Sequence, residues 1–440
     1  MYGLLGKVVD TAASPNTRRF EPLVVFLIVA AIRVLGVFVL PQTRIPPDAT
    51  EYRYLAKNLA ETGRYGFVPG WQDIPRLNES PWRFLYDNTG SFRAPGFSLM
   101  LAGLRLVSGE SERAIDISLA LIEAAAAVLV FLIAQLALGP PAARIAALLY
   151  LLNPGSVQSI SWGCRESLIT FLVLCGIYLA MKSRIGNAWL AVLAGLDLGL
   201  AGYIKENALV VAIIAALWML ALGLRGEKGL LWRAALIVML TVASCVPWVI
   251  RNCVAYGRPA GTSTLGGLAL WHGVVNPHWP YDAFRTTDYT QGLSPADRDR
   301  LEPRTATDAL DADHRLIQIV KIAVTKNPAM VPRAMVRNMG LFWSPLSKTC
   351  MELGIKQRPQ ELISSVYYVT CFALAVVGLW AFRRNPYTWL ILFILVGMTL
   401  LHSITFAAPR FRVPYDPFVL IYAAGALFLL VERRERAQNI

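Results

Sequence analysis

The chain has 440 residues, of which 55% are hydrophobic and only 16% are charged. Soluble globular proteins carry about 25% charged residues, so the composition excludes an ordinary soluble domain and indicates a polytopic membrane protein. The net charge of +13 does not indicate a nucleic-acid surface, because no run of Lys and Arg alternates with the stacking aromatic residues that such a groove requires.

Ten stretches of the sequence approach the roughly 20 apolar residues that a helix needs to cross the hydrocarbon core. They run over residues 22–41, 114–138, 142–159, 167–183, 187–203, 206–224, 230–250, 361–382, 387–406 and 413–432. The predicted fold is therefore all-α, with about ten spans, and eleven to thirteen spans are also compatible with the sequence. Residues 1–21 are polar, so the first stretch is interpreted as an uncleaved helix. Residues 95–107 are apolar but short, which predicts a re-entrant or in-plane helix.

The distribution of Lys and Arg predicts the side on which each loop lies, because short cytoplasmic connections carry the excess of basic residues. The basic set comprises Lys7, Arg18, Arg19, Arg144, Lys182, Arg184, Arg225, Lys228, Arg233, Arg383, Arg384, Arg433, Arg434 and Arg436. The opposite short connections hold only Arg165, Lys205, Arg410 and Arg412. We therefore expect a plasma (inner) membrane protein with both termini inside. Two long loops, residues 42–113 and 251–360, are expected on the periplasmic or extracytoplasmic face.

The first long loop carries Asp48 just after two prolines and at the start of an amphipathic helix. Asp48 has two interpretations. It is a helix cap that forms a capping box with Glu51, or it is a carboxylate that accepts the proton of an attacking hydroxyl group above the bilayer. The residue types favour the cap, but a carboxylate at a helix N-terminus stays ionised, so both roles are compatible. Arg93, later in the loop, is a snorkelling interfacial residue or a phosphate ligand.

The short outer connections add further candidates at the membrane boundary. Glu166 either pairs with Arg165 or caps its helix, or it is a second acid that binds a divalent ion or orients the acceptor. Lys205 and Glu206 lie close to hydrocarbon, where ionisable groups pair with each other or serve a function, and phosphate binding is the functional alternative for Lys205.

Arg410 and Arg412 break the basic-inside pattern, which indicates either anionic lipid headgroups or a specifically bound phosphate. The six cysteines form no CxxC pair. A disulfide between Cys253 and Cys350 across the second long loop and two free thiols are both compatible with the predicted location, and we favour the free thiols.

The order and sidedness of these features resemble the C-type glycosyltransferase superfamily. The closest resemblance is to its bacterial branch of protein O-mannosyltransferase-like, lipid A aminoarabinose transferase-like and lipopolysaccharide galacturonosyltransferase-like proteins. The marks in this chain are residues 48–63, Arg93-Ala94-Pro95, residues 154–166, Arg251-Asn252 and residues 410–414. The resemblance implies one membrane-embedded domain over residues 1–440, with the catalytic motif in the first long loop and acceptor selection in the second.

The resemblance also implies a glycosyltransferase that moves a sugar from a polyprenyl-phosphate-linked donor to an envelope glycolipid, glycan or protein. Asp48 would be the general base and Glu166 the second acidic residue. The substrate and phosphate ligands would be drawn from Glu51, Tyr52, Arg93, Lys205, Arg251, Arg410 and Arg412. The resemblance leaves open whether a divalent cation, Mg²⁺ or Mn²⁺, is a cofactor. Asp48 and Glu166 would be its ligands. Its ligand geometry would differ from the family's usual pattern, because Glu166 stands where Asp is frequent.

Two other classes of protein compete with this interpretation. A transporter or flippase of a lipid-linked or polar solute is the main alternative, and a non-catalytic scaffold of envelope assembly is the other. Transporters usually place ionisable groups near the membrane midplane, in broken helices of repeated halves. Here these groups gather at one interface, so the sequence favours the glycosyltransferase, with membrane lipids, the donor and the acceptor as partners and no nucleic acid.

Overall fold

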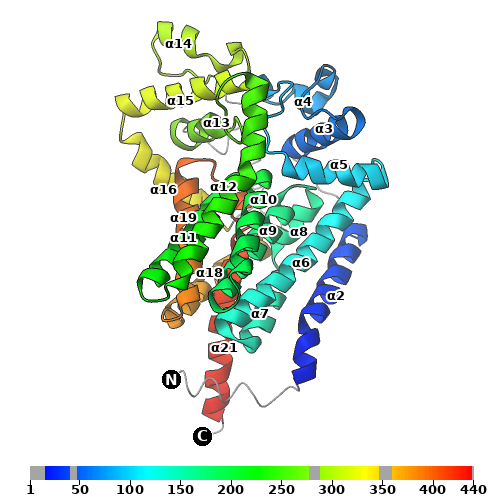
Figure 1. The fold of residues 1–440 in the computed structure, drawn as a ribbon, viewed down its shortest axis with the longest axis vertical. Coiled ribbons are helices and arrows are strands. Elements are labelled where there is room, and N and C mark those ends of the chain that lie inside the picture. The colour runs from blue at the N-terminus through cyan, green and yellow to red at the C-terminus, as the bar shows by residue number, and fades with distance from the viewer. Residues whose placement is uncertain (1–14, 40–46, 277–287, 346–358, 439–440) are drawn as a thin grey trace.

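The computed structural model describes residues 15–39, 47–276, 288–345 and 359–438, and every regular element in these ranges is helical (Figure 1). The all-α prediction is confirmed. A bundle runs roughly along the long axis of the molecule. Its helices are α2 (Pro15–Val39), α6 (Glu112–Leu138), α7 (Pro140–Leu151), α8 (Pro154–Ser161), α9 (Glu166–Ile185), α10 (Trp189–Ile204), α11 (Ala208–Leu224), α12 (Gly229–Tyr256), α18 (Pro359–Ala381), α19 (Pro386–Ile404) and α21 (Asp416–Gln438).

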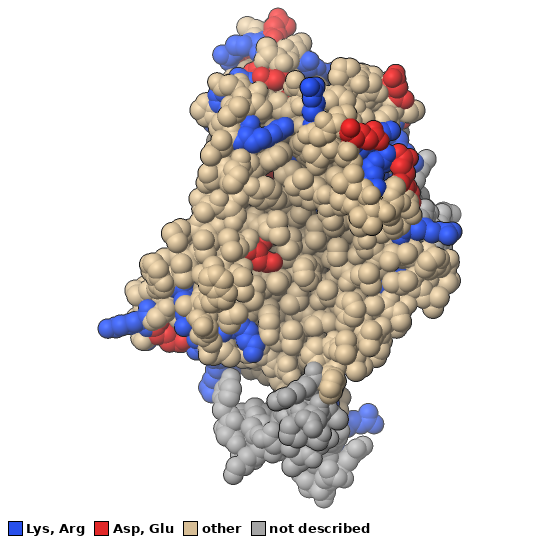
Figure 2. Space-filling view, turned by 45° about the vertical axis from the view of Figure 1, so that its right-hand side comes forward, with Lys and Arg blue, Asp and Glu red and all other residues tan. Residues whose placement is uncertain are grey.

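The surface of the bundle is apolar, as a lipid environment requires. Side chains such as Leu27, Val242 and Val376 are more than half exposed. Figure 2 shows a broad, almost uncharged band between two charged ends of the molecule. Within the described ranges six helices are long and apolar enough to cross a membrane, and α10 and α11 are apolar but have only 16 and 17 residues. The chain is thus a multi-pass membrane protein.

All ten stretches predicted to span contain a helix, but the stretch 142–159 is not continuous. It divides into α7 and α8 because Pro154 has no N–H to donate to the preceding turn. The Asn153 side chain caps the new helix by accepting a hydrogen bond from the Gly155 amide at 2.9 Å. The stretch therefore forms two helices, and the break turns the chain toward the end of the bundle that carries the functional residues.

The two long loops fold together into a cap on one end of the bundle (Figure 1). The cap comprises α3 (Pro47–Thr62), η1 (Trp71–Asp73), α4 (Pro75–Asn78), η2 (Arg83–Leu85), α13 (Gly266–Leu270), η3 (Trp271–Val275), α14 (Pro295–Leu301), η4 (Pro303–Thr305) and α15 (Ala309–Lys326). It has its own buried core, in which Phe67 stacks on Tyr86 with ring centroids 4.1 Å apart and Trp271 packs on Tyr289. Both loops contribute to this core, so they form one ordered unit.

Three further helices complete the described structure. α5 (Gly96–Ser108) lies across the bundle axis in Figure 1, as the prediction of an in-plane helix requires. α16 (Met330–Phe342) follows α15 and packs against α19, and α20 (Pro409–Arg412) is a single turn between α19 and α21. α2 begins and α21 ends at the end of the bundle opposite the cap.

Candidate active site

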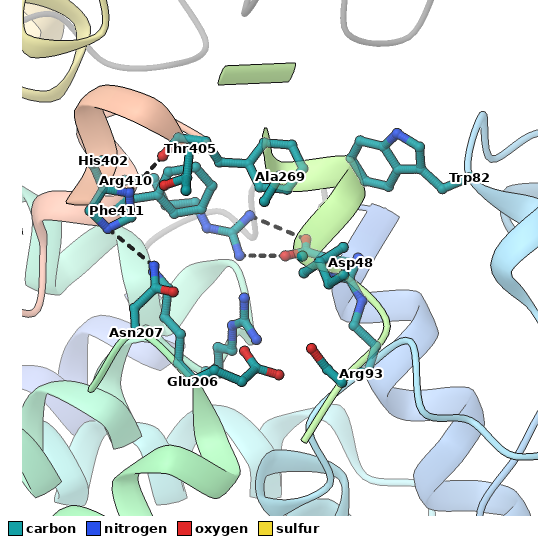
Figure 3. A pocket seen from close by; sticks show the side chains of 16 residues that line it. Asp48, Trp82, Arg93, Glu206, Asn207, Ala269, His402, Thr405, Arg410 and Phe411 are labelled. Carbon is teal, nitrogen blue, oxygen red and sulfur yellow. Dashed lines mark hydrogen bonds and ion pairs between the residues drawn. The ribbon is translucent and has the colours of Figure 1, made fainter. Parts of the chain in front are cut away.

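A cavity of about 210 Å³ lies where the cap meets the ends of the bundle helices (Figure 3). Its walls come from the first turn of α3, the turn before α9, the break between α10 and α11, and residues 402–411. The second long loop contributes residues 263–269, and Trp82 and His402 stand on opposite sides in Figure 3. The cavity therefore gathers side chains from both long loops and from several short connections.

Arg410, which lines this cavity, joins two carboxylates. Its Nη1 and Nη2 atoms lie 3.2 and 2.5 Å from the two oxygens of Asp48, and its Nε lies 2.8 Å from Oε1 of Glu166. The side chains of Arg410 and Glu166 are 7% and 1% exposed, so these charge-assisted hydrogen bonds form away from water, where they are strong. Asp48 and Glu166, which the sequence predicts at one level of the membrane, thus share one guanidinium group.

The capping box predicted for Asp48 and Glu51 does not form. Glu51 turns into the cap, where its Oε2 accepts a hydrogen bond from Nε of Arg93 at 2.6 Å and its Oε1 accepts one from the Tyr86 hydroxyl. Both oxygens of Asp48 instead face Arg410. Asp48 still lies in the first turn of α3, so the helix dipole adds to the stabilisation of its charge.

Two opposing effects act on the pKa of Asp48. Burial raises this pKa, because the charged form loses water, and the guanidinium groups of Arg410, Arg93 and Arg165 together lower it by more. The pKa of Asp48 therefore lies below the ordinary value of an aspartate. The side chain is ionised at physiological pH, as a proton acceptor must be.

Lys205 and Arg165 form the positive part of the cavity. The Lys205 side chain is 4% exposed, and its Nζ has no hydrogen-bond partner among the described residues. Arg165 donates from Nη1 to the Ile204 carbonyl at 3.2 Å, and its Nε has no partner in the same part of the chain. Within the described ranges no ion pair joins Lys205 to Glu206 or Arg165 to Glu166. The geometry therefore disfavours the ion pairs between sequence neighbours that the sequence offered as one alternative.

This arrangement suits an anion. Burial and the neighbouring Arg165 charge lower the pKa of Lys205 to about 7, so the surroundings disfavour its charged form. An anion bound against Nζ would restore the preference for the ammonium. Phosphate oxygens accept hydrogen bonds from ammonium and guanidinium groups alike. The cavity therefore offers two cations to a phosphate beside an ionised Asp48.

Local sequence features hold these side chains in place. The Tyr52 ring lies against both Arg93 and Arg165, with guanidinium carbons 5.5 and 5.4 Å from its centroid. Gly163 has a positive φ of 57°, which favours glycine in the turn that presents Arg165. A Cβ at Gly96 would lie 2.8 Å from a backbone carbonyl oxygen at the end of α10, so only glycine allows α5 to approach the residues before Lys205 this closely.

Four residues predicted to bind substrate or phosphate do not line the cavity, and these are Glu51, Tyr52, Arg251 and Arg412. Arg251 donates to the Tyr65 carbonyl at 2.9 Å near the end of α12. Arg412 pairs with Asp416 at 2.7 Å and donates to two carbonyls at and after the end of α16. These side chains support the walls and the neighbouring helices, and their contact with substrate stays a prediction. Cys350 lies outside the described residues, so its predicted relation to Cys253 is untested.

Asp48 and Glu166, which the sequence offers as ligands of a divalent cation, do not fit one in this arrangement. The Arg410 guanidinium lies between them and donates to three of their four oxygens. In the described part of the chain no third His, Cys, Asp or Glu joins them as a ligand group. Mg²⁺ and similar ions bind oxygen ligands in an open octahedral shell, which a guanidinium in the same space prevents. The positive charge between these two carboxylates is that of Arg410.

Reasoning from the sequence alone misses part of the cavity. Trp82, Asn207 and His402 line it, although single aromatic, amide and imidazole groups have no diagnostic spacing. His402 carries one usable signal, because it stands at the outer end of a predicted span, on the same predicted side as Lys205. Arg165 stands out in the sequence as a basic residue of an outer connection and as the neighbour of Glu166, and its place beside Lys205 depends on the fold.

Residues 92–249 match the family model described as dolichyl-phosphate-mannose-protein mannosyltransferase. The matched range is less than half of the chain, and it includes Arg165 and Lys205 but neither Asp48 nor Arg410. No curated protein matches the chain in sequence.

Several solved structures share the fold at low sequence identity. AglB from Archaeoglobus fulgidus, an archaeal oligosaccharyltransferase in complex with an inhibitory peptide and a dolichol-phosphate, has a TM-score of 0.56 and 14% identity over 96% of this chain and 52% of that chain. The apo form of the A. fulgidus oligosaccharyltransferase gives a TM-score of 0.57 at 14% identity, over 96% of this chain and 52% of that chain. ArnT from Cupriavidus metallidurans, bound to undecaprenyl phosphate, gives a TM-score of 0.43 at 13% identity, over 92% of this chain and 77% of that chain.

The chain spans about half of the length of the oligosaccharyltransferase chain. The family-model match and the shared helical architecture agree with the resemblance read from the sequence motifs. The chain shares the multi-helix membrane fold of the A. fulgidus oligosaccharyltransferase.

Proposed function

We propose that this protein is a membrane glycosyltransferase that takes a sugar from a polyprenyl-phosphate-linked donor in the cavity beneath the cap. The observation that supports this most strongly is the pair of buried basic side chains, Lys205 and Arg165, which have no acidic partner among the described residues and lie beside the ionised Asp48. Glycosyl transfer requires a site that stabilises the leaving phosphate and a group that accepts a proton. Here Lys205 and Arg165 offer the first and Asp48 the second, and all three line one cavity. The dolichol-phosphate bound to AglB supports a lipid phosphate as the donor's carrier.

The proposed reaction is a displacement at the anomeric carbon of the donor sugar. The acceptor oxygen attacks this carbon, the bond between the carbon and the phosphate oxygen breaks, and its electron pair stays on the lipid phosphate. Lys205 and Arg165 stabilise the charge that develops there. Asp48 takes the proton of the attacking hydroxyl group. A carboxylate with a lowered pKa is a weak base, so this proton moves late, after the attacking oxygen has become acidic.

Three further residues serve this chemistry in the proposal. Arg410 fixes the direction of Asp48 through two hydrogen bonds, and Glu166 fixes Arg410 in turn. Arg93 lines the cavity next to them with its charge partly offset by Glu51, so it contributes to the positive field around the donor phosphate. In this proposal these side chains carry binding, orientation and proton transfer.

The sidedness and the loop roles belong to the same proposal. The basic connections support a cavity that faces away from the cytosol, so the donor would reach it from within the bilayer and the acceptor from outside. Residues 251–360 would select the acceptor, because residues 263–269 of this loop line the cavity on the side of the cap. Transport is the competing function, and sugar transfer and solute uptake measured in the same vesicles separate the two.

Binding of a polyprenyl phosphodiester should weaken about tenfold between pH 6 and pH 8. At pH 6 Lys205 is already charged, because its pKa is about 7. At pH 8 most free protein holds a neutral Lys205, so each bound anion must also bring a proton, and the apparent Kd rises tenfold per pH unit. The charged groups that face Lys205 are Arg165, Arg410, Glu166 and Glu206. The phosphodiester itself does not titrate in this range.

The measurement is the affinity of protein in lipid nanodiscs for undecaprenyl phosphate-linked glucose, mannose or galactose over this pH range. The Lys205→Met variant should bind more weakly and show no pH dependence. Lys228→Met, on an exposed turn between α11 and α12, is the matched control and should behave as the wild type. A wild-type affinity that stays constant from pH 6 to pH 8 would argue against a phosphate at Lys205.

A further inference from the structure

Beside the two cations, the cavity presents two hydrogen-bond acceptors. Glu206 and Asn207 follow Lys205 directly in the break between α10 and α11, and all three line the cavity. Oε1 of Glu206 is buried and has no hydrogen-bond partner among the residues that the structure describes. A buried carboxylate oxygen without a donor is costly, so its position calls for a ligand that donates.

The orientation of the Asn207 amide follows from His402. Nδ1 of His402 lies 2.6 Å from the backbone carbonyl oxygen of Phe406. A carbonyl oxygen only accepts, so Nδ1 carries the hydrogen, and the other ring nitrogen, Nε2, is an acceptor in the neutral imidazole. Nε2 lies 3.3 Å from Nδ2 of Asn207. The amide must therefore turn its NH₂ group to His402, and its oxygen is left to accept a hydrogen bond elsewhere.

His402 itself cannot turn to another tautomer or direction at low cost. Its ring is stacked between Phe342 and Phe411, with centroids 5.0 and 5.6 Å away and interplanar angles of 16° and 5°. The side chain is 1% exposed. Two phenyl rings and one carbonyl thus hold the imidazole, and the imidazole holds the amide. Figure 3 shows the Asn207 oxygen directed away from His402.

The position of these acceptors matches a specific part of the donor. In a polyprenyl-phosphate sugar the anomeric carbon is one bond from the phosphate oxygen, so the sugar ring lies directly beside the phosphate. Glu206 and Asn207 are the next residues after the phosphate-binding candidate Lys205. Trp82 lines the opposite side of the cavity in Figure 3 and offers an apolar face to the ring. A hydroxyl-bearing ring that fills this space would donate to both acceptors.

We propose that Glu206 and Asn207 determine which sugar is transferred, by accepting hydrogen bonds from two hydroxyl groups of the donor sugar, and that His402 is the positioning residue that fixes the Asn207 amide. This inference rests on the proposed function, because it takes the donor phosphate to bind at Lys205. It assigns recognition of the sugar to the break between α10 and α11, separate from the acceptor and from Asp48.

The test compares two kinds of probe on protein in nanodiscs. One is undecaprenyl phosphate without sugar, and the other is a set of undecaprenyl phosphate-linked glucose, mannose and galactose. The wild type should prefer at least one sugar-bearing lipid over the bare lipid. Asn207→Leu should weaken binding of that probe about tenfold, and Glu206→Leu about thirtyfold, because a hydrogen bond to a charged acceptor is the stronger one. Glu206→Gln, which keeps an acceptor oxygen, should be affected less.

His402→Phe provides the sharpest readout, because it keeps the stacked ring and removes the acceptor nitrogen. It should weaken binding of the sugar-bearing probe about as much as Asn207→Leu, and the double variant should show no further loss, because both changes remove one interaction. None of these variants should change binding of bare undecaprenyl phosphate.

Three results would overturn the proposal in different ways. Equal weakening of both probes by the variants would show a structural role for these residues and no recognition of the sugar. Equal binding of bare and sugar-bearing lipid by the wild type would leave the phosphate site standing and remove the sugar site. Binding of neither probe by the wild type would overturn the proposed function and this inference with it.

Discussion

Replacing Asp48 by Asn should lower the rate of sugar transfer about a hundredfold to ten-thousandfold, which is the usual contribution of a positioned general base. Asn has the same shape and still accepts a hydrogen bond from Arg410, but it cannot take a proton. Binding of the donor should stay close to that of the wild type, because Lys205 and Arg165 are untouched. The loss should therefore appear in kcat and not in KM.

The measurement is transfer of label from a radiolabelled undecaprenyl-phosphate sugar in membranes that contain the wild type or the variant. Asp73→Asn is the matched control, because Asp73 is an exposed aspartate of the same loop and should leave transfer unchanged. Near-normal transfer by the Asp48→Asn protein would refute the assignment of the base. It would leave the phosphate site unaffected, since that site depends on other residues.

Replacing Arg410 by Ala should both inactivate and destabilise the protein. The change leaves Asp48 and Glu166 as two buried negative charges without a partner, and removing one side of a buried pair typically costs about 3–5 kcal/mol. Transfer should fall at least about a hundredfold, because Asp48 is no longer oriented or stabilised as an anion. Arg410→Lys should not restore it, because an ammonium cannot bridge both carboxylates as the planar guanidinium does.

Thermal unfolding in detergent, followed beside the transfer assay, separates the two effects. The triple variant Asp48→Asn, Glu166→Gln, Arg410→Ala carries no unpaired charge, so it should regain much of the stability but none of the activity. Arg258→Ala, which removes a partly exposed pair with Asp308 on the cap, is the control and should cost about 1 kcal/mol or less. A triple variant no more stable than the single one would contradict the account of the two unpaired charges.

The contacts of Arg410 with Asp48 and Glu166 also predict how the wild type responds to metal removal. Because Arg410 supplies the positive charge between the two carboxylates, treatment with EDTA should leave transfer unchanged. A loss of activity with EDTA that Mg²⁺ or Mn²⁺ restores would mean that a cation takes the place of the guanidinium during the reaction.

The fold was largely predictable because hydropathy reports directly on membrane spans. Each predicted stretch contains a helix, and the short stretch at 95–107 became a helix across the bundle axis. The apolar stretch 142–159 forms two helices because Pro154 breaks it. A proline inside an apolar stretch either kinks a helix or ends it, and only the neighbouring helices decide which.

The site was predictable in part, and the errors have a geometric cause. The sidedness of the loops placed four residues at one level of the membrane, namely Asp48, Glu166, Lys205 and Arg410. All but Glu166 line the cavity, and Glu166 contacts it through its ion pair with Arg410. Arg412 was grouped with Arg410 because both interrupt an apolar run. Residues two apart in a helical turn do not face the same way, so Arg412 points to Asp416 instead.

The pairing of charges was beyond the reach of sequence spacing. Glu51 was matched to Asp48 by a local rule, yet it pairs with Arg93, 42 residues away along the chain. Glu166 was matched to its neighbour Arg165, yet it binds Arg410 from the other end of the chain. Both partners depend on how the cap and the helix ends approach one another, which no local pattern encodes.

A structure of the protein in nanodiscs with undecaprenyl phosphate, solved by electron cryo-microscopy, tests most directly whether the cavity beneath the cap is the donor site. The account predicts the phosphate oxygens within hydrogen-bonding distance of Lys205 Nζ and the Arg165 guanidinium, with Asp48 still held by Arg410. A phosphate bound instead at Arg251 or Arg412, with the cavity free of lipid, would contradict it.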